Sequence, residues 1–304
     1  MKIKIIEVGA RDGLQNEMQA LSVKDRYDFI KKLCDSGLKI IEAGAFVSPK
    51  WVPQMDNSNK VLTKLFKDQT SGKINSKIQF PMLVPNMKGF QRAMDSQTKE
   101  IAIFGACSES FSQKNINCSI NQSFGHFKAV INAAKKNNVK VRAYLSVAFG
   151  CPYEGKVSEQ RVIKLTEKLI QLGAYEVSIG DTIGVATPKQ VRSLVNKLGL
   201  KIPLKKVAMH FHDTRGTALA NVLASLDLGI HTFDSSLGGL GGCPYAKGAS
   251  GNLATEDLVY MLEGMGHKTG VDISKLIKIN KWIENKVGHQ LPSHVGKTES
   301  SLYK

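Results

Sequence analysis

An alternation of short apolar runs and amphipathic segments constrains the fold of this chain more than any other feature. The runs are rich in β-branched residues, as buried strands are, and apolar residues recur at intervals of three and four in the segments between them. We predict strands at residues 2–8, 39–43, 78–84, 100–104, 140–148, 175–179, 206–211 and 230–235. A predicted helix follows each strand, at residues 22–36, about 52–67, 87–95, 120–137, 158–172, 188–198, 215–228 and 255–265.

Eight strands that each precede a helix predict an α/β protein whose parallel strands close into a (β/α)8 TIM barrel. No linker rich in proline, glycine and serine divides the 304 residues, so we expect one catalytic barrel domain over residues 1–304. A doubly wound open sheet is the alternative. Helical spacing at 272–288 adds a C-terminal helix, packed on the barrel flank or in an oligomer contact. The extension 272–304 would then end in a loosely ordered polar tail.

Composition narrows the class of protein. No run of about 18 apolar residues predicts a membrane span, and the N-terminal residues lack the pattern of a signal peptide. The five cysteines form no CxxC pair, so we expect free thiols and a cytoplasmic protein. The formal net charge of +16 raises nucleic-acid binding as an alternative. Lysines spread along helical faces, with only 7% aromatic residues, favour a solvated basic surface instead.

Two histidines, His210 and His212, lie one residue apart at the end of the seventh predicted strand. Alternation along a strand points them to the same face, which suits metal ligands. One core histidine and one surface histidine would explain the pair equally well. Barrel closure lets Asp12 and Asn252 approach them, and this nitrogen and oxygen set favours Mg2+ or Mn2+ over structural zinc. For Asn252, a place in the first turn of a helix is the alternative.

Further polar residues stand at the strand ends, where a TIM barrel builds its active site. Arg11 could stabilise negative charge on an enolate or carboxylate, although Gly13 beside it also fits a plain surface turn. Glu42 and Asp181 are acids at the ends of apolar strands. Proton transfer, orientation of other ligands, and simple pairing with Arg11 or His210 all remain open for them.

A glycine-rich segment at 238–252 carries Cys243. It has no GxxxxGK[ST] pattern, so a phosphate-binding loop is the weaker interpretation. A mobile lid that closes over substrate and brings Cys243 to the reacting carbon, as acid, base or nucleophile, is the stronger one. The residues therefore predict metal-assisted chemistry on an oxygen-rich substrate.

Six segments of the chain resemble the 3-hydroxy-3-methylglutaryl-CoA lyase family, which belongs to the metal-dependent TIM-barrel lyases and synthases. They are VGARDGLQNE at 8–17, FVSPKWVPQM at 46–55, GCPYEG at 150–155, GDTIGVATP at 180–188, HFHDTRGTALAN at 210–221 and GGLGGCPYAKGASGN at 238–252. The resemblance covers nearly the whole chain in order, and the cysteine loop is its most specific motif.

The resemblance implies retro-Claisen cleavage of (S)-3-hydroxy-3-methylglutaryl-CoA to acetoacetate and acetyl-CoA. A base drawn from the metal-site acids and His210 would take the hydroxyl proton, Arg11 would stabilise the enolate, and Cys243 would protonate its carbon. Glu42 and Asp181 match positions needed for activity. The implied ligands of Mg2+ or Mn2+ are Asp12, His210, His212 and Asn252. Besides Arg11, the implied substrate-binding residues are Gln15, Arg142, Tyr144, Ser178 and, toward the CoA, Lys114 and Asn115.

The chain departs from the family pattern at Gly44 and Ala45, where relatives carry hydroxyl residues, and at Met18, where a lysine is common. The first departure leaves acyl specificity open. A lyase of another branched 3-hydroxyacyl-CoA, or a Claisen-type synthase or aldolase, is therefore the alternative activity. We expect a homodimer without a membrane or nucleic-acid partner. Leucine degradation and ketone-body formation are equal candidates for its pathway.

Overall fold

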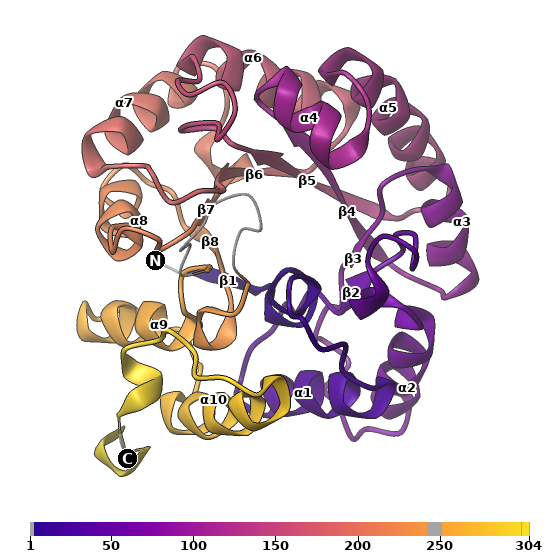
Figure 1. Cartoon of the computed structure of the whole chain (residues 1–304), viewed down its shortest axis with the longest axis vertical. Helices are drawn as coiled ribbons and strands as arrows, with labels where there is room; N and C mark the ends of the chain where they lie inside the picture. The colour runs from indigo at the N-terminus through magenta and orange to yellow at the C-terminus, as the bar shows by residue number, and fades with distance from the viewer. Residues whose placement is uncertain (1–2, 242–250, 299, 304) are drawn as a thin grey trace.

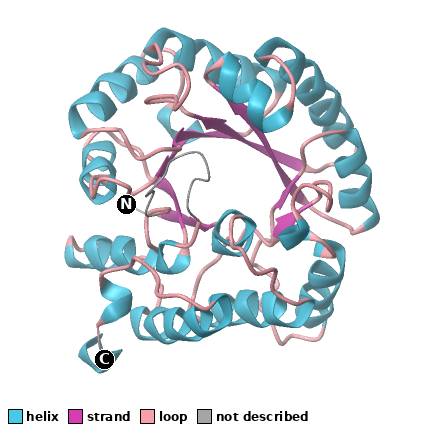
Figure 2. Cartoon of the chain, in the orientation of Figure 1, coloured by secondary structure: helices cyan, strands magenta, loops and turns pink. Residues whose placement is uncertain are grey.

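Eight parallel strands form one sheet, which surrounds the centre of the molecule, and helices surround the strands (Figures 1 and 2). The computed structural model describes residues 3–241, 251–298 and 300–303. The strands form one sheet in the order β1-β8-β7-β6-β5-β4-β3-β2. A parallel bridge between Glu7 and Ile41 joins the two outer segments of that sheet. The predicted TIM barrel is confirmed.

The strands follow the predicted runs with shifted ends. They are β1 Lys4–Glu7, β2 Gly44–Ala45, β3 Met82–Leu83, β4 Glu100–Ala106, β5 Lys140–Ser146, β6 Glu176–Asp181, β7 Val207–Phe211 and β8 Thr232–Ser235. The α-helices are α1 Val23–Asp35, α2 Ser58–Thr70, α3 Met87–Asp95, α4 Glu109–Ile116, α5 Ile120–Lys136, α6 Glu159–Leu172, α7 Pro188–Gly199, α8 Ala218–Leu226, α9 Thr255–Gly264 and α10 Ile273–Val287.

Hydroxyl residues set the start of several helices. The side chains of Ser22, Ser119 and Ser158 accept hydrogen bonds from backbone N–H groups in the first turns of α1, α5 and α6. Such caps satisfy donors that have no partner inside the helix. The apolar residues of each helix then pack on the strands, which places the core between the two layers.

The short strand β2 contains an irregularity that the sequence pattern did not predict. Ala43 N donates to Pro81 O and Phe46 N donates to Leu83 O, so three residues on one strand span two on the other. This extra residue is a bulge, which interrupts the alternation of side chains. A Cβ atom added at Gly44 would lie 2.7 Å from the Oγ atom of Ser58, on the helix side of the strand.

Helix α4 was also missed, because a largely polar segment of eight residues offers little apolar periodicity. Ser108 caps it by accepting a hydrogen bond from Phe111 N. The helix lies directly after β4, at the end of the barrel where the other polar residues gather.

Helix α10 packs beside α1 and α9, as Figure 1 shows, and the residues after it correct one expectation. The tail was expected to be loosely ordered. Instead, the carboxylate of Asp257 accepts hydrogen bonds from the Ser293 hydroxyl and from the N–H groups of His294 and Val295. The side chain of Leu291 is buried as well. The tail through residue 298 is thus fixed to α9. Among the described residues, no helix is long and apolar enough to cross a membrane.

Candidate active site and metal centre

Arg11 and Asp12 lie in a single π-helical turn, Gly9–Gly13, directly after β1. Gly9 N donates to Glu7 Oε1, and a Cβ atom at Gly9 would lie 2.6 Å from that oxygen. A Cβ atom at Gly13 would meet Leu240 at 2.8 Å. Close packing therefore requires glycine at both ends of the turn, which holds Arg11 buried at the barrel mouth and not on an open surface turn.

Asp12, His210 and His212 form a group of possible metal ligands whose donor atoms all lie within 4.8 Å of one another. Asn252 joins them, because its Nδ2 donates to Asp12 Oδ2 at 2.9 Å and to Leu240 O at 2.9 Å. That arrangement leaves Asn252 Oδ1 buried and without a hydrogen-bond partner. A buried amide oxygen without a partner is rare, and this one belongs to a residue that is bonded to a carboxylate beside two imidazoles, a donor set that fits a divalent cation.

The charges of this group suit a cation as well. Burial alone would raise the pKa of Asp12, but Arg11 and the two histidines lower it to about 2. Burial and the neighbouring His210 lower the pKa of His212 to about 3. Both side chains are therefore unprotonated at neutral pH, which is the form that binds metal.

Arg11 connects the ligand group to Glu42. Its Nε donates to Glu42 Oε2 at 2.6 Å and its Nη1 donates to Asp12 Oδ1 at 2.5 Å. The ring of Tyr144 lies between two guanidinium groups, 5.3 Å from Arg11 Cζ and 4.9 Å from Arg142 Cζ. Its hydroxyl donates to Glu42 Oε2 at 3.3 Å. Burial raises the pKa of Glu42, and the adjacent Arg11 opposes that shift.

A cavity of about 160 Å³ opens above these groups. Eight of the predicted site residues line it, namely Arg11, Asp12, Gln15, Asn115, Tyr144, Ser178, His210 and His212. Other lining residues, such as Phe104, Phe111 and Thr182, were not predicted. Phe111 belongs to α4, so its place could not be predicted without that helix.

Three predicted residues lie away from both the ligand group and the cavity lining. Arg142 is buried and pairs with Glu176 and Asp234. Lys114 Nζ lies 4.8 Å from the centre of the Tyr153 ring. The carboxylate of Asp181 accepts hydrogen bonds from Val185 N and Ala186 N, which shapes the loop after β6. Cys243 lies outside the described residues.

One buried acid close to the metal-ligand group escaped prediction. Asp234 is 1% exposed and its Oδ2 lies 3.4 Å from His210 Nδ1. The signal was the same as for Glu42, an acid inside an apolar strand, but the neighbouring Ser235 and Ser236 made the segment resemble an ordinary strand end.

Known proteins resemble the whole chain. Hydroxymethylglutaryl-CoA lyase, mitochondrial, of Pongo abelii is 49% identical over 301 residues, which is 99% of this chain and 90% of that protein. The crystal structure of hydroxymethylglutaryl-CoA lyase from Pseudomonas aeruginosa superposes with a TM-score of 0.91 at 47% identity, over 97% of this chain and 96% of that one. An HMG-CoA lyase from Acinetobacter baumannii, solved with coenzyme A and 3-methylmalate, gives 0.90 at 36% identity over 98% and 95%.

The profile of the HMGL-like family matches residues 2–283, a span that includes every strand and the whole ligand group. The match therefore rests on the barrel and on the residues that its mouth brings together. On this evidence the chain belongs to the HMGL-like family.

Proposed function

We propose that this protein is a metal-dependent carbon–carbon lyase that cleaves (S)-3-hydroxy-3-methylglutaryl-CoA to acetoacetate and acetyl-CoA. The observation that carries the proposal is the convergence of Asp12, His210 and His212 with an unpartnered Asn252 oxygen beside Arg11. That ligand chemistry suits Mg2+ or Mn2+, because three different residue types and room for substrate oxygens favour octahedral coordination.

Bound at these four residues, the metal would supply Lewis-acid polarisation of the tertiary hydroxyl, whose pKa it would lower. The chain supplies the proton transfers. A base at the metal site takes the hydroxyl proton, the C2–C3 bond breaks, and the electron pair passes to the thioester as an enolate. Arg11 places its positive charge toward that enolate, with Glu42 fixing the guanidinium through Nε. Cys243 then donates a proton to the enolate carbon.

The first test is direct. Protein stripped with a chelator and then given Mg2+ or Mn2+ is expected to release acetoacetate from the substrate, whereas the stripped protein alone is expected to release none. Absence of product with both ions would contradict the proposal. The same assay on a panel of branched 3-hydroxyacyl-CoA thioesters measures acyl specificity. The panel is needed because Gly44 and Ala45, where the chain departs from the family pattern, do not line the cavity and so do not indicate which acyl chain binds.

The role of Cys243 has a separate test. Cys243→Ala is expected to reduce turnover strongly and to leave the metal dissociation constant almost unchanged. A large loss of metal affinity would identify the thiolate as a ligand and exclude it as the proton donor. Cys118→Ala is the matched control, because that thiol lies on the loop between α4 and α5.

We further propose a homodimer in a reducing compartment, the cytoplasm. The four described cysteines are unpaired and buried, which suits such a compartment. Trp51 and Met18 are 87% and 102% exposed, and Gln54 Nε2 joins their segments by donating to Glu17 O. Exposed apolar groups of this kind mark contact surfaces. Light scattering is expected to give twice the 33.2 kDa of one chain, and cell fractionation checks the compartment.

A further inference from the structure

Asp234 occupies a position that none of the roles above explains. It stands on β8 in register with His210 on β7, and its Oδ2 lies 3.4 Å from His210 Nδ1. Ser178 Oγ donates to the same oxygen at 2.6 Å. One carboxylate thus contacts both a metal-ligand candidate and a hydroxyl that lines the cavity.

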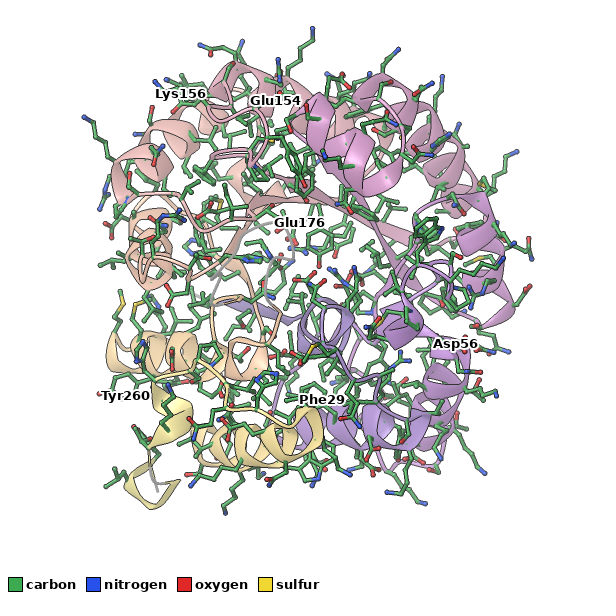
Figure 3. All side chains as sticks on the ribbon, viewed as in Figure 1. Phe29, Asp56, Glu154, Lys156, Glu176 and Tyr260 are labelled. Atoms are coloured by element: carbon green, nitrogen blue, oxygen red, sulfur yellow. The ribbon has the colours of Figure 1, made fainter. Side chains whose placement is uncertain are left out.

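The carboxylate is itself held from below. Arg142 Nη2 donates to Asp234 Oδ1 at 2.8 Å and Nη1 lies 3.3 Å from Oδ2. Arg142 Nε donates in turn to Glu176 Oε1 at 2.8 Å, and Lys4 pairs with the other oxygen of Glu176. Figure 3 shows Glu176 inside the ring of strands. The charges of two carboxylates and two cationic side chains balance there, so Asp234 is ionised and fixed in orientation.

The consequence concerns the tautomer of His210. An ionised carboxylate can only accept hydrogen bonds, and the ring nitrogen that faces it has no other partner. A proton on Nδ1 is therefore stabilised, and the lone pair of the neutral ring is left on Nε2. A small movement of the ring would shorten the 3.4 Å contact to hydrogen-bond length. Metal-binding histidines are oriented in this way in many proteins.

We propose that Asp234 is a positioning residue, which fixes the Nδ1–H tautomer of His210 so that Nε2 faces the metal, and which holds the Ser178 O–H in a hydrogen bond so that the Oγ lone pairs remain to accept from substrate. This inference rests on the proposed metal site. Arg142, which sequence comparison alone would place against substrate, acts here through Asp234.

The first experiment needs no variant. Two-dimensional 15N NMR of protein labelled at histidine distinguishes the two tautomers, and the His210 signals are assigned by their loss in His210→Gln. We expect Nδ1–H in metal-free protein and after addition of Mg2+. An Nε2–H tautomer in both states would overturn the inference.

The second experiment uses Asp234→Asn. Arg142 requires an oxygen, and a carboxamide has only one, so its NH2 group would face His210 Nδ1 and favour the opposite tautomer. The dissociation constant for Mn2+, measured by calorimetry, is expected to increase by about 10- to 100-fold, with an increase in KM through Ser178. Asp227→Asn is the matched control, since Asp227 makes an exposed ion pair with Arg192.

The outcomes separate the two proposals. If wild-type protein binds Mn2+ and Asp234→Asn binds it equally well, the positioning role is wrong and the metal site stands. If wild-type protein binds no divalent ion, the proposed function fails, and the tautomer in wild-type protein still decides the role of Asp234. The NMR measurement also decides it if Asp234→Asn does not fold.

Discussion

Two buried charge clusters lie one above the other in this barrel, and they differ in how completely they are bonded. The floor cluster consists of Lys4, Arg142, Glu176 and Asp234. The site cluster consists of Arg11, Asp12, Glu42, His212 and Asn252. Among the described residues, every buried side-chain nitrogen and oxygen of Arg142, Glu176 and Asp234 has a partner, whereas Glu42 Oε1, His212 Nδ1 and Asn252 Oδ1 have none.

The difference has a physical meaning. A buried polar atom without a hydrogen bond costs about 1–3 kcal/mol, so a fold retains several of them in one place only where something else binds. The floor cluster is complete and stabilises the barrel. The site cluster is incomplete and is built for a ligand. Substitutions in the site cluster should therefore reduce activity more than stability, whereas loss of the Arg142 cation from the floor cluster should chiefly reduce stability.

The largest effect is expected for His212→Ala in the site cluster. Loss of one ligand removes metal-dependent stabilisation worth several kcal/mol, so kcat/KM should fall by about 10³- to 10⁴-fold. Thermal unfolding of the metal-free variant should show a smaller loss of stability than Arg142→Met, because removal of the buried His212 ring leaves a cavity but no unpaired buried charge. A large loss of stability would show that the two clusters are not separable.

Arg142→Met in the floor cluster should chiefly reduce stability. It leaves the buried Asp234 carboxylate without its cation, which destabilises the folded state by about 3–4 kcal/mol. Urea unfolding measures this. Arg192→Met is the control, because its exposed ion pair with Asp227 is worth less than about 1 kcal/mol. Equal losses in the free energy of unfolding for the two substitutions would contradict the structural role of the floor cluster.

Glu7 extends the comparison, because its carboxylate has hydrogen-bond partners but, among the described residues, no cationic side chain beside it. Its carboxylate accepts from Gly9 N, Leu237 N and Thr255 Oγ1. Burial raises its pKa from 4.5 to about 7 despite these bonds. Burial would also raise the pKa of Asp234, but Arg142, His210 and Ser178 together outweigh it and lower that pKa to about 2.

The pH dependence of stability follows from that shift. Between pH 4.5 and about 7 the folded protein binds a proton that the unfolded chain releases. Stability is thus fully present below pH 4.5 and falls as pH rises through about 7, by about 3 kcal/mol in total. In Glu7→Gln this part of the pH dependence should vanish. Urea unfolding of the metal-free proteins at several pH values measures this difference between wild type and Glu7→Gln. If the free energy of unfolding depends on pH in the same way in both proteins, the prediction is wrong.

Glu42→Gln is expected to have the smallest effect of the four. The amide keeps an oxygen for Arg11 Nε but loses the charge that fixes the guanidinium, so turnover should fall by about 10²-fold. The dissociation constant for Mn2+ should stay close to wild type, because Glu42 is not in the ligand group. A shift in metal affinity as large as the loss in turnover would place Glu42 with the ligands.

Much of the fold could be predicted from local patterns. The α3 range Met87–Asp95 and the start of α5 at Ile120 agree with prediction, because helix caps and apolar spacing are properties of neighbouring residues. The pair His210 and His212 was found for the same reason. Strand ends at β2 and β3 were not found, because a bulge depends on the partner strand.

The sequence by itself determined a barrel with two histidines on one face of a strand and polar residues at its mouth. Only the tertiary structure decided between the interpretations of Asn252, whose Nδ2 bonds Asp12 across the closure of the barrel. Only the tertiary structure shows that Arg142 bonds Asp234 and does not enter the cavity, and that a side chain at position 44 would face Ser58. The physical reason is that alternation assigns a side chain to a face of the sheet, whereas its partners across the barrel follow from register and closure.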